Sequence, residues 1–198
     1  YQVSISLGEG DKNQVEDTVA VTVVGDPRLA ISAGQRAAHY QSMLALQELQ
    51  ASTVSAVEFI VHTRSDLDTV DRLIAQQTAA AKNAAKDDAG LKKLAGQSAS
   101  LRKSLDALEA KFRVAPEIRG SVYADDRVES RIGLAQAYVG SSPDAETPAA
   151  SAYLKLAEQG LASAQEEMNL LVAGELATFR SAVSAAGSRC WPSAPSVS

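Results

Sequence analysis

The 198-residue sequence contains a single cysteine, Cys190, which excludes an internal disulfide and has no cysteine or histidine neighbour at metal-ligand spacing. Aromatic residues make up only 5% of the chain, so large rings do not dominate its core. No apolar run approaches the roughly 20 residues that a membrane-spanning helix requires. Proline is also scarce, and its absence between Pro27 and Pro116 leaves that stretch available for uninterrupted helix.

An excess of positive charge is missing as well. The chain has 19 Lys and Arg against 24 Asp and Glu, which gives a net charge of −5. Nucleic acids and anionic membranes both select a basic surface, so this balance argues against them as partners. What is present is abundant alanine, which favours slender, closely approaching helices.

Catalytic motifs are absent too. The sequence has no nucleophile elbow, HExxH, Walker loop, EF-hand pattern or CxxC. Gly8 and Gly10 form a GxG, but no third glycine and no helix follow it, so an ordinary hairpin turn explains them better than a phosphate loop. His39 and His62 would lie about 35 Å apart on one straight helix and cannot share a metal.

Three pairs of neighbouring carboxylates are better explained by helix capping and solvated surface than by glycosidase chemistry, which needs two carboxylates facing each other across a cleft. They are Asp87-Asp88, Asp125-Asp126 and Glu166-Glu167. We therefore predict no catalytic, cofactor-binding or metal-ligating residue.

A β hairpin is predicted at the start of the chain. Apolar and polar residues alternate from Tyr1 to Leu7, as in a strand with one buried face. A polar, glycine-rich turn follows at 8–13, and a second strand is predicted from about Thr18 to Val24. Since an isolated hairpin is marginally stable in water, these strands must pair with others or pack on the helices.

A helix of about 50 residues is predicted from Ala33 to about Ala84, with a capping box at its start formed by Ser32 and Gln35. A break in the polar stretch 63–66 is the alternative. We expect one apolar stripe on this helix, made of Tyr40, Met43, Leu46, Val54, Val57, Ile60, Val61, Leu67 and Ile74.

Two charged residues, Arg64 and Asp71, fall near this stripe. Either they pair across the bundle, or they mark where the stripe rotates outward, and we favour the second interpretation.

A second helix is predicted from a reversal at 86–90, where Asp87 or Asp88 would cap it, to Pro116. Its apolar positions alternate spacings of three and four, which is typical of a helix that packs against other helices. They are Leu91, Leu94, Ser98, Leu101, Leu105, Leu108, Phe112 and Ala115. A short connection between matching stripes predicts antiparallel neighbours.

A short helix is predicted at 126–139, capped near Asp126, and a long one begins with Thr147 as N-cap and Pro148 at its first position. The apolar pattern of the long helix is displaced by one residue after Leu171, which indicates a local unwinding. Gly187 is predicted to end this helix, and the Pro/Ser-rich residues 188–198 to form a flexible tail.

The order of these elements resembles the C-terminal region of bacterial sortilin-like, BNR-repeat propeller proteins, often labelled glycosyl hydrolase. The likeness is carried by Tyr1-x-Val3-x-Ile5-x-Leu7, by a second strand ending Val21-x-Val23, and by Asp26-Pro27-Arg28 before a long helix that begins near Ser32. The stretches 132–134 and 138–141 before Thr147-Pro148 are also similar to the closing segment of that family. The charged hairpin turn and the tail containing Cys190 depart from the family pattern. The resemblance implies one or two upstream propellers, then an immunoglobulin-like domain, and a periplasmic or extracellular location.

We therefore predict a mainly α chain: an antiparallel three-helix bundle of long helices preceded by a two-stranded β hairpin, the remnant of an immunoglobulin-like domain. The predicted regions are 1–28 for the hairpin, 29–187 for the bundle and 188–198 for the tail. Tyr1 opens directly into a strand, so we expect a processed or truncated part of a longer protein.

The predicted function is a non-catalytic C-terminal accessory or scaffold domain of an exported propeller protein. That larger protein would be glycosidase-like or ligand-binding. The alternative is a free-standing helical subunit that binds another protein, for which Val70 and Val172 would be exposed.

Overall fold

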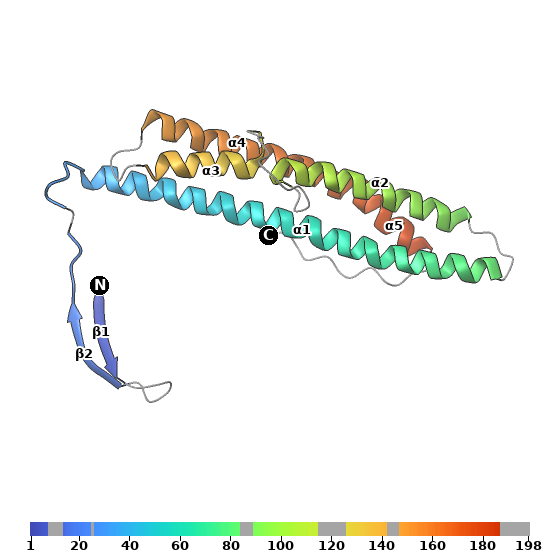
Figure 1. Ribbon diagram of the computed structural model, residues 1–198, viewed down its shortest axis with the longest axis horizontal. Coiled ribbons are helices and arrows are strands. Elements are labelled where there is room, and N and C mark those ends of the chain that lie inside the picture. The colour runs from blue at the N-terminus through green and yellow to red at the C-terminus, as the bar shows by residue number, and fades with distance from the viewer. Residues whose placement is uncertain (8–13, 25, 84–88, 115–125, 142–146, 187–198) are drawn as a thin grey trace. The chain divides into compact units, whose positions relative to one another are not determined.

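The computed structural model describes residues 1–7, 14–24, 26–83, 89–114, 126–141 and 147–186. The chain divides into two units, Tyr1–Ala33 and Gly34–Ser198. The first unit holds a two-stranded antiparallel hairpin and the second is helical (Figure 1). The sequence predicts this order along the chain, a hairpin followed by a mainly helical region. The predicted turn at 8–13, the caps Asp87 and Asp88, Gly187 and the tail lie outside the described residues.

The hairpin pairs β1 (Gln2–Leu7) with β2 (Gln14–Ala20). Val3 lies opposite Val19, and Ser4 lies opposite Thr18, with 3.0 Å between the two hydroxyl oxygens. Because directly opposed residues share a face, one face of the hairpin is apolar around Val3 and Val19 and the other is polar around Ser4 and Thr18.

The second strand ends four residues earlier than the valine-rich pattern predicts, so that prediction is wrong at its end. Beyond the strand, the Tyr1 and Val21 backbones exchange hydrogen bonds of 2.8 and 3.0 Å. No β1 residue lies opposite Val23 or Val24 in the described hairpin. A β-branched sequence favours extended backbone, but a strand also requires a paired neighbour, and the described pairing ends at Gln2 and Ala20.

The first helix, α1 (Ala33–Asn83), is a single helix of 51 residues and about 75 Å in length. The predicted continuous helix is confirmed, and the alternative break at 63–66 is absent. Thr63 is buried and its hydroxyl donates a 2.8 Å hydrogen bond to the carbonyl of Phe59 one turn earlier. The Thr63 side chain therefore bonds within the continuous helix, and Arg64 of the same stretch binds carboxylates of α2.

Most buried residues of α1 follow one heptad set, which we call the inner seam, although Val57 and Phe59 are buried outside it. Its members are spaced alternately by three and four residues and face the other helices. They are Ser42, Leu46, Leu49, Thr53, Ala56, Ile60, Thr63, Leu67, Val70 and Ile74. Of the predicted stripe, Tyr40, Met43, Val54 and Val61 do not belong to this face and are exposed, so the prediction of one wide buried stripe is wrong.

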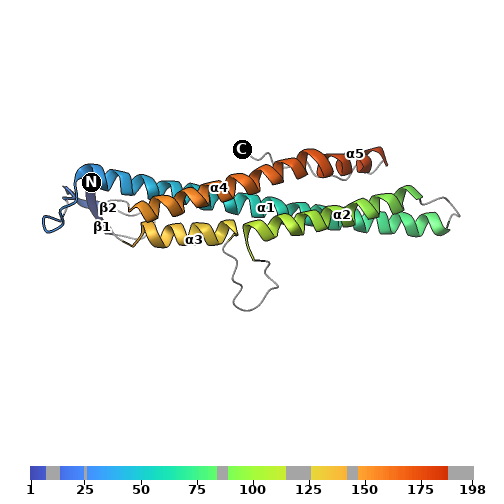
Figure 2. The same cartoon turned by 90° about the horizontal axis from the view of Figure 1, so that it is seen from above.

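Two helices follow each other along α1: α2 (Ala89–Phe112) and α3 (Val128–Val139) (Figure 2). Of the predicted apolar positions of α2, six are confirmed as buried: Leu94, Ser98, Leu101, Leu105, Leu108 and Phe112. Leu91 is half-buried, and Ala115 lies outside the described residues. The start of α3 falls within the predicted capping stretch 126–129. The N-cap position belongs to Arg127, which makes no side-chain cap hydrogen bond. The carboxylate of Asp126 instead pairs with Arg131 at 3.4 Å.

The chain returns along α2 and α3 through α4 (Pro148–Leu171), the π-helix η2 (Val172–Leu176) and α5 (Ala177–Ala185). Thr147 is the N-cap of α4, with its hydroxyl accepting a 3.1 Å hydrogen bond from the Ala150 amide, and Pro148 stands at the first position, as predicted. The π-helix lies where the apolar pattern is displaced by one residue, so the predicted local unwinding is confirmed. Both views place α4 beside α3 and α5 toward the far end of α2 (Figures 1 and 2).

Candidate functional site

Catalytic geometry is not found among the described residues. No three His, Cys, Asp or Glu side chains there are grouped as metal ligands, and no described helix is long and apolar enough to cross a membrane. His39 and His62 both lie on α1, the first half-buried and the second exposed. Glu167 pairs with Lys111 of α2, and Glu166 is exposed, so this carboxylate pair has a surface position. Cys190 lies outside the described residues.

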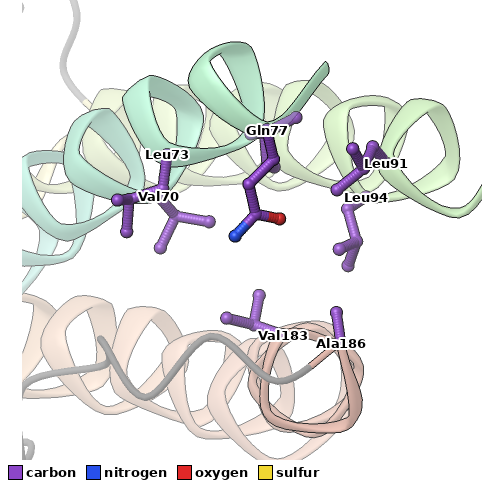
Figure 3. A pocket seen from close by; sticks show the side chains of 8 residues that line it. Val70, Leu73, Gln77, Leu91, Leu94, Val183 and Ala186 are labelled. Carbon is purple, nitrogen blue, oxygen red and sulfur yellow. The ribbon is translucent and has the colours of Figure 1, made fainter. Parts of the chain in front are cut away.

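A small cavity lies where α1, α2 and α5 meet (Figure 3). Val70 and Leu73 of α1, Leu91 and Leu94 of α2, and Val183 of α5 surround it. Its volume is about 10 Å³, which is the space of about one water molecule. The cavity is a packing gap and cannot hold a substrate.

A long open groove lies between α1 and α3. Its main part has a volume of about 900 Å³, and a second part of about 420 Å³ shares Gln47, Gln50 and Gln136 with it. From α1, the groove is lined by Tyr40, Met43, Leu44, Leu46, Gln47, Gln50, Ala51, Thr53, Val54, Val57 and Glu58. From α3 and the end of α2 come Glu129, Ile132, Gly133, Gln136 and Arg113. We call this feature the α1/α3 groove.

The composition of the α1/α3 groove suits a helix better than a small molecule. Its apolar members run along one side of α1 for almost five turns, and its charged members stand at one end. Small ligands are held in concave pockets that cover most of their surface, and this groove is long and open. An amphipathic helix placed lengthwise would cover the apolar row.

The second feature is a cluster of ion pairs between α1 and α2. Arg64 of α1 binds Asp106 and Glu109 of α2, the former at 2.5 Å. Farther along, Arg102 of α2 binds Asp68 and Asp71 of α1, both at 2.7 Å. Arg64 and Asp71 therefore pair across the bundle, and the interpretation that they mark an outward rotation of the stripe is wrong. Their partners lie more than 30 residues away, which sequence spacing does not reveal.

Glu109 is the buried member of this cluster, with 3% of its surface exposed. Burial alone would raise the pKa of its carboxyl group. Hydrogen bonds and charge from Arg64 and Arg113 outweigh burial and hold the pKa of Glu109 below its ordinary value. The shift has a structural explanation, because Glu109 is paired with Arg64 of the neighbouring helix and with Arg113, and it does not by itself indicate catalysis.

Comparison with known proteins gives no match. No family model, curated protein or solved structure matches it. The resemblance to sortilin-like, BNR-repeat proteins therefore stays a prediction, as do the immunoglobulin-like origin of the hairpin and the exported location.

The two site features differ in how visible they are in the sequence. The apolar residues of the α1/α3 groove are noticed by their spacing, but the spacing alone assigns them to the core. The ion-pair cluster leaves one signal, charged residues near an apolar stripe at Arg64 and Asp71. That signal admits two explanations until the position of α2 is known.

Proposed function

We propose that the chain is a non-catalytic C-terminal accessory or scaffold domain of a larger exported protein. In this proposal the helices act as an antiparallel three-helix bundle, with α2 and α3 together forming one of its three members. The hairpin completes an immunoglobulin-like domain, and any glycosidase-like or ligand-binding activity belongs to an upstream propeller. The family part of this proposal depends on the resemblance.

The observation that carries the proposal is the uncovered apolar face of the hairpin. Val3 is 49% exposed, Ile5 63% and Val19 57%. A two-stranded hairpin is marginally stable in water, and an alternating strand is expected to bury its apolar face. These strands therefore suit the edge of a larger β domain in which other strands cover Val3 and Val19.

The decisive experiment compares the 198-residue chain with the protein purified from its source, using intact mass and amide hydrogen exchange. We expect the natural protein to extend upstream into propeller repeats, and we expect the β1 and β2 amides to exchange far more slowly in it than in the 198-residue chain. An open reading frame with only a signal peptide before Tyr1 would contradict the proposal. So would equally fast exchange in both proteins.

Catalysis by this chain is tested separately on a panel of aryl glycosides. We expect no turnover by the purified 198-residue chain. Activity that disappears on substitution of one carboxylate would show instead that the chain is a hydrolase.

A second candidate function is a free-standing helical subunit that assembles with another protein. The predicted support for it is wrong, because Val70 is buried and Val172 is half-buried. The α1/α3 groove supplies different support, since it leaves apolar residues of α1 in solvent. Sedimentation of the purified chain, with and without extracts of its source, distinguishes an accessory domain from an assembly subunit only when a partner is identified. The α1/α3 groove is therefore the better place to begin a test of assembly.

A further inference from the structure

A second heptad set lies on α1, one residue after the inner seam. Its members are Tyr40, Met43, Gln47, Gln50, Val54, Val57 and Val61, spaced by three and four in strict alternation. We call it the outer seam. Its large apolar members include Tyr40 at 60% exposed and Val54 at 55% exposed, and only Val57 is buried. Six of the seven residues line the α1/α3 groove.

Such a set is what one helix presents to another in a coiled coil. The groove beside the outer seam is also lined by two small residues, Ala51 on α1 and Gly133 on α3. Small side chains leave room for the backbone of another helix to approach closely. An exposed row of large apolar residues, with two glutamines at its centre and charged residues near its ends, is typical of an interaction surface.

We propose that the α1/α3 groove is a self-association surface, in which the first half of α1 from a second copy of this chain lies antiparallel along the outer seam. The two copies then form a four-helix arrangement from two α1 and two α3 helices around a two-fold axis. This inference is independent of the accessory-domain proposal, which holds for either a monomer or a dimer.

The order of residues in the outer seam favours a second copy over an unrelated helix. In an antiparallel pair centred between Gln47 and Gln50, these two residues face each other, and each amide has a partner. Tyr40 then faces Val57, and Met43 faces Val54, so that apolar layers meet apolar layers on both sides. A partner with apolar residues at the centre would bury the glutamine amides without hydrogen bonds, which is unfavourable. A second copy supplies matching polar layers automatically.

The charges favour the antiparallel orientation. Arg36 and His39 stand near the first end of the outer seam, and Glu58 stands near the other end. An antiparallel pair brings Arg36 of one copy to the level of Val61 of the other, one turn from its Glu58, and does so twice by symmetry. A parallel pair would instead set Glu58 against Glu58. The groove also contains Glu129, and Arg113, whose guanidinium is already bound to Glu109 at 2.8 Å.

The first test is sedimentation of the full chain over a range of concentrations. We expect a dimer at micromolar concentration, and we expect Val54→Asp to raise the dimer dissociation constant roughly a hundredfold, because each dimer contains two of these layers. Val54 is exposed in the single chain, so the circular dichroism spectrum and the monomer melting temperature should not change. The matched control is Leu170→Asp on α4, at a residue that is 68% exposed and does not line the groove.

The second test determines orientation by disulfide formation in a Cys190→Ser background. A mixture of the Gln47→Cys and Gln50→Cys variants should cross-link to each other, and each variant alone should cross-link little. Efficient cross-linking of Gln47→Cys with itself would indicate a parallel pair and overturn the proposed arrangement. A chain that stays monomeric at all concentrations, or a dimer indifferent to Val54→Asp, would overturn the proposal. The monomeric result would leave the groove to a helix of a different protein.

Discussion

Arg64 on α1 holds the buried carboxylate of Glu109 on α2, and the two residues fix how these helices align. Elsewhere in the same cluster the signs are reversed, since Arg102 of α2 binds Asp68 and Asp71 of α1. Sliding α2 by one heptad would replace Glu109 with Arg102 opposite Arg64. Apolar heptads alone are compatible with such a slip, so the charges select the register.

Removal of Arg64 should destabilise the protein. Arg64→Met leaves Glu109 buried with only Arg113 as partner, and we expect a loss of about 2 to 3 kcal/mol in the free energy of unfolding. Chemical denaturation measures this loss. The control is Arg72→Met on the same helix. Arg72 is exposed and, among the described residues, binds the Asp68 carbonyl and the Thr69 hydroxyl, and its loss should cost less than about 0.5 kcal/mol. Equal effects of the two substitutions would contradict the role assigned to Glu109.

Stability should fall in acid because of Glu109. The pKa of Glu109 is lower in the folded protein than in the unfolded chain, where a glutamate has a pKa of about 4.3. The stabilisation is thus present above about pH 4.3 and is lost as pH falls through the folded pKa. The free energy of unfolding, measured between about pH 2.5 and 5, should decline more steeply for the natural sequence than for Glu109→Gln. Parallel profiles for the two proteins would show that other carboxylates account for the decline.

Leu101 tests the packing of α2. It is 1% exposed, and Leu101→Ala should cost roughly 2 to 5 kcal/mol through lost burial and a residual cavity. Leu170→Ala makes the same chemical change at an exposed position of α4 and should have little effect. A Leu101→Ala melting curve that matched the unmodified protein would mean that the apolar positions of α2 are assigned incorrectly.

Thr147 tests the start of α4. Its hydroxyl accepts a hydrogen bond from the Ala150 amide, and Thr147→Ala should reduce stability by about 1 kcal/mol. Thr147→Ser keeps an accepting hydroxyl and should recover most of the difference. If serine and alanine behaved alike, the hydrogen bond would not be the reason for the effect.

The sequence predicts α2 well because its information is local. Leucines such as Leu94 and Leu105 repeat along one face of the helix, and a helix with a single such face is expected to bury it. The start of α4 is likewise local, since Thr147 and Pro148 fit only the first positions of a helix. The length of α1 follows from the absence of proline between Pro27 and Pro116.

The sequence does not reveal which side of α1 faces the core. The inner and outer seams lie one residue apart on this helix. At several positions the outer seam has the more hydrophobic residue, although the inner seam is the one that is buried. Tyr40 and Val54 are exposed, whereas Ser42 and Thr63 are buried. The two hydroxyls are tolerated because each donates to the carbonyl four residues earlier, at 3.4 Å for Ser42 and 2.8 Å for Thr63. The choice depends on where α2 to α5 lie, which no local pattern contains.

The π-helix between α4 and α5 determines which codon changes this part of the gene can accept. One added residue turns everything after it in an α-helix by about 100° and advances it by 1.5 Å. The wide turn at Val172–Leu176 takes up one such residue within its own length, so that Met168 before it and Phe179 after it are both buried. A single-codon deletion inside Val172–Leu176 would therefore remove the extra residue, return this turn to ordinary α-helix and leave Phe179 and Val183 on the buried face. The same deletion between Phe179 and Val183, where α5 has no extra residue, would rotate Val183 by about 100° away from that face.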